Sequence, residues 1–461
     1  MSVAGSSVCI AGAGPTGALL AILLSRRDVR VTLYDSRPDP RRGPRASGRS
    51  INLALADRGL HALEAAGALD SIKGSLVPMR GRFVHAPDGR GALQPYGRRP
   101  DEIIYSISRH RLSAMLLGLA LQRPGVQARF EHRLEDADFD ARVAHVRDSK
   151  RGVVIDVPME PLLAADGAGS VVRHCMAARG LIEARETDLE HGYKELIMPS
   201  GSHGSYPMSR EALHIWPRGG YMLIALPNQD GSFTATLFLP TRGATSFSSL
   251  TTPAAIEEFL SSSFPDAFAL MPSCVEEFQR NPTGFLGTVY AHGWHVRGTA
   301  ALIGDAAHAI VPFHGQGMNC CFEDCIEFDA CMDGASSWEA VFADFYARRK
   351  PNTDAIAQMA LENYLEMRER VVDPKFQLQQ ALALELERRF PQRFIPRYSM
   401  VMFHHEIPYE TAARRGSVQA KLLADLTRDA TSLADVDHAR AGREIELALP
   451  ALPRLSSVTK L

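Results

Sequence analysis

A carboxylate, a proline-containing turn and a glycine-rich helix start follow one another between residues 301 and 324. Asp305 comes after an apolar run that predicts a buried strand, and open α/β sheets bind their ligands at such strand ends. Gly317, Met318 and Asn319 open a predicted helix, whose start would offer free N–H groups and a partial positive charge. This combination suits a polyhydroxylated chain joined to a ring that becomes anionic, and reduced flavin is such a ring. The alternative is an ordinary strand-to-helix connection with incidental glycines.

The segment Gly12-Ala13-Gly14-Pro15-Thr16-Gly17 lies between a predicted strand, residues 8–11, and a predicted helix, residues 18–24. In this context three glycines form a dinucleotide fingerprint: the first permits the tight turn, the second lets the backbone reach the pyrophosphate, and the third lets helix and strand pack closely. Asp35 ends the next predicted strand, 23 positions after Gly12, where a carboxylate can hold both hydroxyls of an adenosine ribose. That acid disfavours a ribose that carries a 2′-phosphate.

The chain between Arg37 and Arg49 is rich in arginine, proline and glycine, which predicts a loop of high positive charge. Its arginines could bind a pyrophosphate or the phosphates of a nicotinamide cofactor, or the loop could simply be solvated. No second glycine fingerprint occurs downstream. A nicotinamide cofactor would therefore have no dinucleotide domain of its own and would have to bind a shared surface.

The composition describes a globular chain of 461 residues, large enough for two or three domains, with 45% hydrophobic residues and a formal net charge of −2. That balance argues against nucleic acid or an anionic membrane surface as the main partner. The seven cysteines have no paired spacing, and the four between 320 and 331 lack a Cys-x-x-Cys pair, so neither a disulfide framework nor a metal site is expected. Because no segment reaches the length of a membrane span, the protein is expected to be cytoplasmic, without a membrane anchor.

The pattern of predicted elements changes twice along the chain. Strands first alternate with helices; the apolar segments 213–216, 221–226 and 233–239 then predict an antiparallel sheet, with a hairpin turn at 228–231. From Trp338 onward the sequence is mainly helical. One face of the predicted sheet could wall an apolar cavity or could be a plain core face; it carries Leu213, Met222, Ile224, Leu226 and Phe238.

Other polar residues fall at predicted element ends. Asp166 ends a further buried strand, and Arg109 opens a helix, where it is positioned for a phosphate or a flavin edge, with Ser108 as a possible cap. The alternation through residues 79–85 predicts a strand, and on a strand Arg80 and Arg82 would point to one side.

The glycine fingerprint with Asp35, then Asp166-Gly167 with Ser170 and Arg173, then Gly304-Asp305 resemble, in that order, the three flavin motifs of the class A, single-component FAD-dependent aromatic hydroxylases. The resemblance implies an α/β fold: a Rossmann-like FAD-binding domain with an inserted antiparallel-sheet substrate domain and a C-terminal helical region. The implied bounds are 1–72, 101–175 and 291–372 for the FAD-binding domain, 73–100 and 176–290 for the substrate domain, and 373–461 for the helical region.

Further segments resemble the branch of that family whose substrate is the aromatic amino acid L-kynurenine; they are 48–55, 79–82, 191–195, 312–319, 362–364 and 397–400. The resemblance implies that the amino-acid end of the substrate binds Arg82, Tyr96, Asn363 and Tyr398. The aromatic ring would then lie near Phe238, Pro312, Phe313, His314 and Met367, with Leu213, Ile224 and Leu226 on the apolar wall. The residues expected to bind FAD are Gly12, Gly14, Thr16, Gly17, Asp35, Arg37, Leu53, Ala54, Arg109, Asp166, Asp305, Gly317, Met318 and Asn319.

The implied reaction is hydroxylation of L-kynurenine to 3-hydroxykynurenine: NADPH, a transient co-substrate, reduces FAD, O2 adds at flavin C4a, and the hydroperoxide transfers oxygen to the ring. No general base stands out, and for His314 a steric or water-positioning role is favoured over proton transfer. One alternative is a related hydroxylase of another anthranilate-like or phenolic acid. Another is a flavin-binding redox sensor or docking protein without turnover. Monomer and homodimer both remain open.

Overall fold

The computed structural model describes residues 3, 5–42, 52–371, 373–453, 455 and 459, and its centre is a six-stranded sheet. The predicted loop arginines beyond residue 42, and the first part of segment 48–55, lie outside the described residues. The strands run in the order β18 (His295–Val296), β19 (Ala300–Leu302), β12 (Leu162–Ala164), β1 (Ser7–Ala11), β2 (Arg30–Asp35) and β8 (Val126–Phe130). All neighbours are parallel except β18 and β19. Because β1 lies between β12 and β2, the strand order reverses there, which is where such sheets bind ligands.

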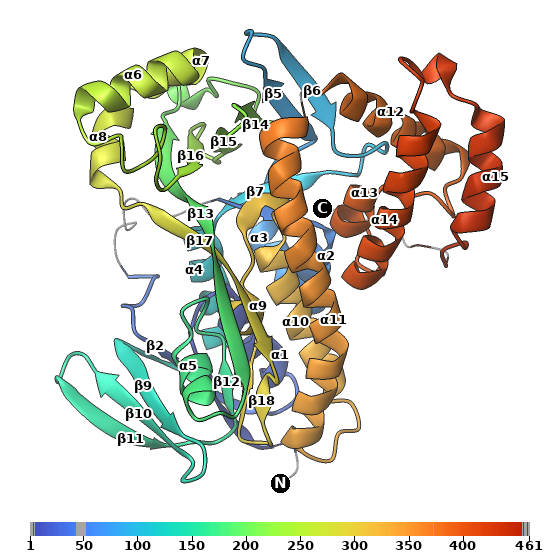
Figure 1. The fold of residues 1–461 in the computed structure, drawn as a ribbon. Helices are drawn as coiled ribbons and strands as arrows, with labels where there is room; N and C mark the ends of the chain where they lie inside the picture. The colour runs from blue at the N-terminus through green and yellow to red at the C-terminus, as the bar shows by residue number, and fades with distance from the viewer. Residues whose placement is uncertain are drawn as a thin grey trace.

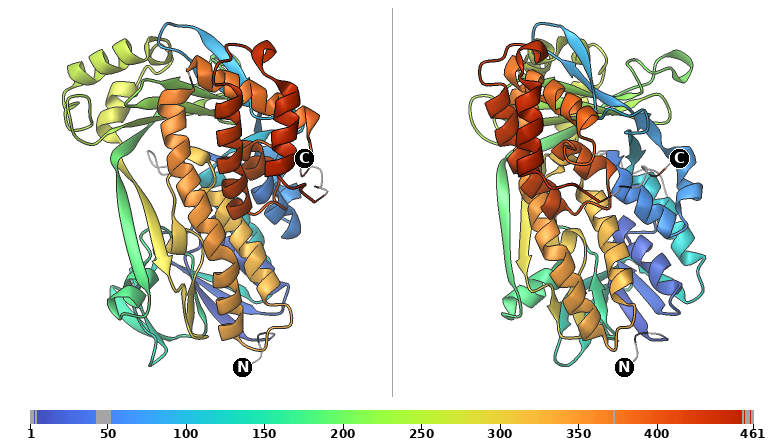
Figure 2. Two further views of the ribbon diagram at one scale, coloured as in Figure 1. Left: turned by 45° about the vertical axis from the view of Figure 1, so that its right-hand side comes forward. Right: turned by 90° about the vertical axis from the view of Figure 1, so that its right-hand side faces the viewer.

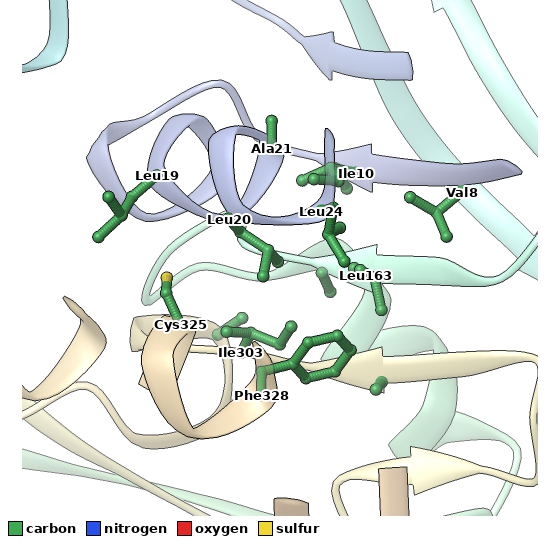
Figure 3. Packing of buried hydrophobic residues seen from close by; sticks show 14 of the residues in the cluster. Val8, Ile10, Leu19, Leu20, Ala21, Leu24, Leu163, Ile303, Cys325 and Phe328 are labelled. Atoms are coloured by element: carbon green, nitrogen blue, oxygen red, sulfur yellow. The ribbon is translucent and has the colours of Figure 1, made fainter. Parts of the chain in front are cut away.

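The helices around this sheet bury a common apolar core (Figure 1). Figure 3 shows Leu20 and Leu24 of α1 (Pro15–Ser25) turned toward Leu163 of β12, Ile303 just after β19, and Phe328 of α10 (Gly317–Cys331). Each such fully buried side chain contributes about 1.5–3 kcal/mol. The helices of this part are α1 (Pro15–Ser25), α2 (Asp57–Ala65), α3 (Leu69–Ile72), α4 (Arg109–Leu121), α5 (Val171–Ala178), α9 (Asp305–His308) and α10 (Gly317–Cys331), with the short 3₁₀ helix η1 (Lys73–Ser75).

A second, seven-stranded sheet lies above the first (Figure 1). Its order is β17 (Gly284–His292), β13 (Glu183–Met198), β16 (Phe233–Pro240), β15 (Met222–Pro227), β14 (Ala212–Pro217), β5 (Gly81–His85) and β6 (Gly91–Pro95). The hairpin predicted at 228–231 is confirmed between β15 and β16. The sheet is antiparallel except for the pair β14 and β5. One face packs on α6 (Pro253–Ser263), α7 (Pro265–Phe268) and α8 (Cys274–Arg280); the 3₁₀ helix η2 (Ser202–Gly204) lies in the loop before β14.

The strand predicted through residues 79–85 is broken at Arg80, and the expectation that its two arginines share a side is wrong. Met79 ends β4 (Val77–Met79), which pairs in a small sheet with β7 (Ile104–Ser108) and β3 (Asn52–Leu55). Arg80 is exposed and pairs with Glu211, whereas Arg82, on β5, is buried. A third small sheet contains β9 (His132–Asp138), β10 (Val143–Asp148) and β11 (Val153–Pro158).

The C-terminal part is helical, as predicted, and Figure 2 shows it packed along one side of the molecule. It contains α11 (Trp338–Leu365), the π-helix η4 (Glu366–Arg370), α12 (Pro374–Arg389), α13 (Arg397–Phe403), α14 (Tyr409–Leu426), η5 (Leu433–Asp435) and α15 (His438–Ala448). None of the helices within the described residues is long and apolar enough to cross a membrane. All seven cysteines are free and buried, so the prediction of no disulfide framework is confirmed.

Arg58 of α2 links this helical part to the helices that pack on the first sheet. Its guanidinium is fully buried, pairs with Glu323 of α10 and lies 3.9 Å from the centre of the Tyr409 ring. It also donates to backbone carbonyls at Val401 and Ile407. A buried cation with this many partners holds its neighbours in one arrangement, because losing any partner leaves charge unsolvated.

Candidate active site

The glycine fingerprint forms a tight turn between β1 and α1. Gly12 has a φ of +98°, and a Cβ there would lie 2.3 Å from the Ala165 carbonyl oxygen. A Cβ on Gly17 would lie 2.0 Å from the Gly12 carbonyl oxygen, so the third glycine lets helix and strand pack, as predicted. No side chain caps the start of α1, which begins after Gly14. The turn therefore presents backbone N–H groups to a ligand phosphate.

A cleft of about 380 Å³ opens at the carboxyl ends of the parallel strands. Asp35 lines this cleft. Its carboxylate accepts a hydrogen bond from Ala13 N at 2.9 Å and forms an ion pair with Arg37. Burial by itself raises the pKa of Asp35, but the hydrogen-bonded pair with Arg37 outweighs it, and the pKa lies below its usual value. The structure thus brings eight of the predicted cofactor residues together in one cleft: Gly12, Gly14, Thr16, Asp35, Arg37, Arg109, Asp166 and Asp305.

Asp166 supplies a test of whether this cleft suits FAD. Its Oδ2 accepts from Val171 N at 2.9 Å, but its Oδ1 is buried and has no hydrogen-bond partner among the described residues. Burial raises the pKa of this carboxyl, although hydrogen bonds from the start of α5 oppose the shift. An unpartnered buried oxygen beside a glycine cradle needs a ligand donor, and the hydroxyls of a ribose or ribityl chain provide one. The residues present therefore fit FAD.

Residues 315–319, which include the helix start expected at the flavin ring, pack against β3. Gly315 has a φ of +68°, and a Cβ on it would lie 3.2 Å from the Ala54 side chain. The Asn319 amide accepts from Ala56 N at 2.9 Å and donates to the Ala54 and Gly315 carbonyls at 2.8 Å. Asn319 is thus occupied in holding two chain segments together. Gly317 begins α10 without a side-chain cap, and Leu53 and Met318 pack beside the core.

Arg82, Tyr96 and His314 surround the ring of Tyr398, which comes from α13. The Arg82 guanidinium lies 4.6 Å from the Tyr398 ring centre, and the Tyr96 and His314 rings stack on it at 5.7 and 5.4 Å. Three buried atoms of this cluster, Arg82 Nε, the Tyr96 hydroxyl and His314 Nδ1, have no partner with hydrogen-bonding geometry in the described part of the chain. Buried polar atoms are normally paired, so such a group marks a ligand site.

The protonation states within this cluster follow from burial. Burial raises the pKa of both Tyr96 and Tyr398, although Arg82 opposes the shift. Both phenols are therefore neutral and can donate hydrogen bonds. Burial lowers the pKa of His314 to about 3, so its imidazole is neutral at physiological pH. A neutral histidine can position water but cannot act as a strong acid there.

Apolar side chains from the second sheet and from the 310–367 region meet beside this cluster. Phe238 of β16 lies 4.9 Å from Phe313 between ring centres, and Met222 and Met367 pack in the same group. Leu213 and Ile224 pack against both this group and the one that contains Tyr96 and Leu226. Pro312 opens the 3₁₀ helix η3 (Pro312–His314). The predicted wall residues thus share one face.

Asn363 reaches the same region, but its amide is engaged. It donates to the Phe313 carbonyl at 2.7 Å and lies 3.3 Å from the Met367 sulfur. Sequence reasoning missed two residues nearby: Glu366, whose carboxylate lies 3.7 Å from Arg82, and Tyr364, whose ring stacks on Phe313 at 3.9 Å. Glu366 follows Asn363 by three residues where α11 continues into η4, and this spacing was a usable signal for Glu366.

Comparison with known proteins agrees with this geometry. The FAD binding domain family model matches residues 5–329. The tetrameric form of 2-methyl-3-hydroxypyridine-5-carboxylic acid oxygenase shares the fold, with a TM-score of 0.64 at 20% identity over 83% of this chain and 97% of that one. Fold and site together define an FAD-dependent aromatic monooxygenase of class A, which uses bound FAD with NADPH and O2.

Two curated relatives cover almost the whole chain. The chain is 49% identical to kynurenine 3-monooxygenase of Stenotrophomonas maltophilia (strain K279a) over 97% of this chain and 98% of that protein. It is 44% identical to kynurenine 3-monooxygenase of Myxococcus xanthus (strain DK1622) over 96% and 95%. The chain belongs to the kynurenine 3-monooxygenase family.

Proposed function

We propose that this chain hydroxylates L-kynurenine to 3-hydroxykynurenine, consuming NADPH, a proton and O2 and releasing NADP⁺ and water. One observation carries the proposal: buried, unpartnered polar atoms of Arg82, Tyr96 and His314 gather around Tyr398, next to an apolar wall. An aromatic amino acid matches both halves of this arrangement.

The polar end of the site suits an α-amino acid. Arg82 can bind a carboxylate with two parallel, charge-assisted hydrogen bonds, and the neutral hydroxyls of Tyr96 and Tyr398 can donate beside it. Glu366 lies 3.7 Å from Arg82 and can accept from the α-ammonium group. Arginine and glutamate side by side therefore match the two charges of the substrate.

The apolar end suits an aromatic ring and excludes water. Phe238, Phe313 and Met367 form this side, and desolvation there protects a reactive oxygen donor from loss to solvent. The ring amino group of kynurenine activates the neighbouring carbon, so the chain needs no strong base. His314, neutral and stacked on Tyr398, shapes the site and can hold a water molecule.

The cleft that suits FAD lies at the carboxyl ends of the parallel strands. When bound, FAD accepts a hydride from NADPH and activates O2. Gly12, Asp35 and Asp166 would hold its phosphate and sugar groups, and the uncapped start of α10 at Gly317 would favour negative charge on the reduced ring.

The test is NADPH oxidation by the purified holoenzyme with and without L-kynurenine, with the product identified by mass after reaction under ¹⁸O2. The expected result is a large stimulation and a product that carries one labelled oxygen. If labelled product forms only from another aromatic acid, that acid is the substrate in place of L-kynurenine. No stimulation by any aromatic compound would refute a hydroxylase function.

A further inference from the structure

A second cleft, of about 690 Å³, lies beside the FAD cleft, at the start of α4. Its polar lining includes Ser106, Ser108, Arg111, Asn228, Gln229 and Asp230, whose carboxylate accepts hydrogen bonds from Ser232. We propose that this cleft binds the phosphate-bearing part of NADPH during flavin reduction. The inference rests on the proposed function only in that the enzyme needs NADPH.

Adjacent residues of α4 face the two clefts. Arg109 lines the FAD cleft, whereas His110 and Arg111 line the second one. Arg111 is exposed and donates to the Gln229 side-chain carbonyl, and within the described residues it has no carboxylate partner. Arg41, at the same cleft, is neutralised by Asp39. Arg111 therefore supplies a positive charge that a phosphate can neutralise.

The start of α4 adds backbone donors to this charge. Ser108 occupies the N-cap position, but its side chain makes no capping hydrogen bond, so the expectation that it caps the helix through its hydroxyl is wrong. Its Oγ is buried and has no partner among the described residues, and Ser108 lines the cleft. An uncapped start of a 13-residue helix with a spare hydroxyl and an arginine in its first turn suits an anionic phosphate.

The position of the cleft suits a hydride donor. Ser106 and Asn228, both in its lining, are hydrogen-bonded to the Asn52 amide at 3.1 and 2.8 Å. Asn52 is followed on β3 by Leu53 and Ala54, which are expected to bind FAD, and Gly315, just before the helix start expected at the flavin ring, lies against the Ala54 side chain. A ligand with its phosphates at Arg111 would thus extend along β3 toward the ring site.

Size and sequence agree with this assignment. The cleft volume lies in the range of about 300–1,000 Å³ that is usual for small-molecule sites. The chain has one glycine fingerprint, and its cleft suits FAD, so NADPH must bind elsewhere. Among the described residues, the second cleft combines an arginine without a carboxylate partner, a helix start without a side-chain cap, and hydrogen bonds to Asn52 of β3.

The experiment measures binding of NADP⁺ to the FAD-loaded holoenzyme by calorimetry, and anaerobic flavin reduction by NADPH in the presence of kynurenine. Arg111→Gln should raise the Kd for NADP⁺ about tenfold, the effect of losing one charge-assisted hydrogen bond, and should weaken its salt dependence. FAD content, kynurenine affinity and the reduction rate at saturating NADPH should stay unchanged. Arg109→Gln should instead lower FAD retention, and Arg90→Gln, at an exposed hairpin position, should change nothing.

An unchanged Kd for NADP⁺ in Arg111→Gln would overturn the assignment, and so would loss of FAD, because the residue would then belong to the FAD site. A loss confined to NADP⁺, with NAD⁺ unaffected, would place the 2′-phosphate at Arg111; an equal loss for both would place the pyrophosphate there. If NADP⁺ binding depends on Arg111 but the wild-type enzyme does not hydroxylate kynurenine, the proposed substrate is wrong and the NADPH site is still supported.

Discussion

Replacement of Arg82 by glutamine should separate substrate binding from flavin binding. Arg82 is buried and lies 3.7 Å from the Glu366 carboxylate, yet its Nε has no hydrogen-bond partner among the described residues and is available to a ligand. Arg82 can make two charge-assisted hydrogen bonds to the carboxylate, each of about 1.5–3 kcal/mol, and the Tyr96 and Tyr398 hydroxyls would retain part of this binding energy. We therefore expect a net loss of about 3 kcal/mol, which corresponds to a kynurenine Kd raised about a hundredfold.

The assay is titration of holoenzyme with L-kynurenine, followed by the flavin absorbance change, with FAD content measured on the same samples. Arg80→Gln is the matched control, because Arg80 lies two residues away but is exposed and paired with exposed Glu211. Its kynurenine Kd should stay within about twofold of wild type, since exposed pairs contribute about 0–1 kcal/mol.

An analogue of kynurenine that lacks the α-amino group sharpens the test. Arg82→Gln should weaken binding of both compounds, whereas Glu366→Gln should weaken only the parent amino acid. The reasoning fails if Arg82→Gln binds kynurenine normally, or if the variant loses FAD, since the arginine would then support the fold and not the ligand.

Three further variants test the architecture. Gly17→Ala should give protein without FAD, because the added Cβ would lie 2.0 Å from a backbone oxygen. The control Gly118→Ala, on α4, should retain FAD, because a Cβ there meets nothing within 4 Å. Equal flavin content in the two variants would contradict the close packing of α1. Tyr409→Phe removes a 2.7 Å hydrogen bond to buried Gln316 and should lower the free energy of unfolding by about 1–3 kcal/mol. Because Gln316 directly precedes the start of α10, the variant should also form more hydrogen peroxide per NADPH consumed. Unchanged values of both quantities would show that the bond is unimportant. Burial lowers the pKa of His405, but the hydrogen bond to Asp57 outweighs this effect, so the pKa is raised above the usual value of about 6.5. The ion pair therefore stabilises the fold below pH 6.5 and loses this effect as the pH rises through the raised pKa, so the Tm difference between wild type and His405→Asn should shrink over that range. A Tm difference that does not depend on pH would exclude this ion pair.

The sequence by itself predicted most of the polar residues that line the cleft at the strand ends. The glycine turn, Asp35, Asp166 and Asp305 each follow a buried strand, and parallel strands bring their carboxyl ends to one edge, so local pattern was sufficient. The apolar face of the second sheet was likewise predictable, because the pleat alternates side chains between faces whatever the rest of the chain does.

Tertiary structure alone decided which of two similar arginines became buried. Arg80 and Arg82 lie in one alternating stretch, but the chain breaks between two sheets at Arg80, and Tyr398, which lies far along the sequence, packs over Arg82. The pairing of Arg82 with Glu366 and the opening of the second cleft at Ser108 and Arg111 also depend on packing. Periodicity specifies the face on which a side chain lies, whereas its burial and partners depend on which distant segment covers that face.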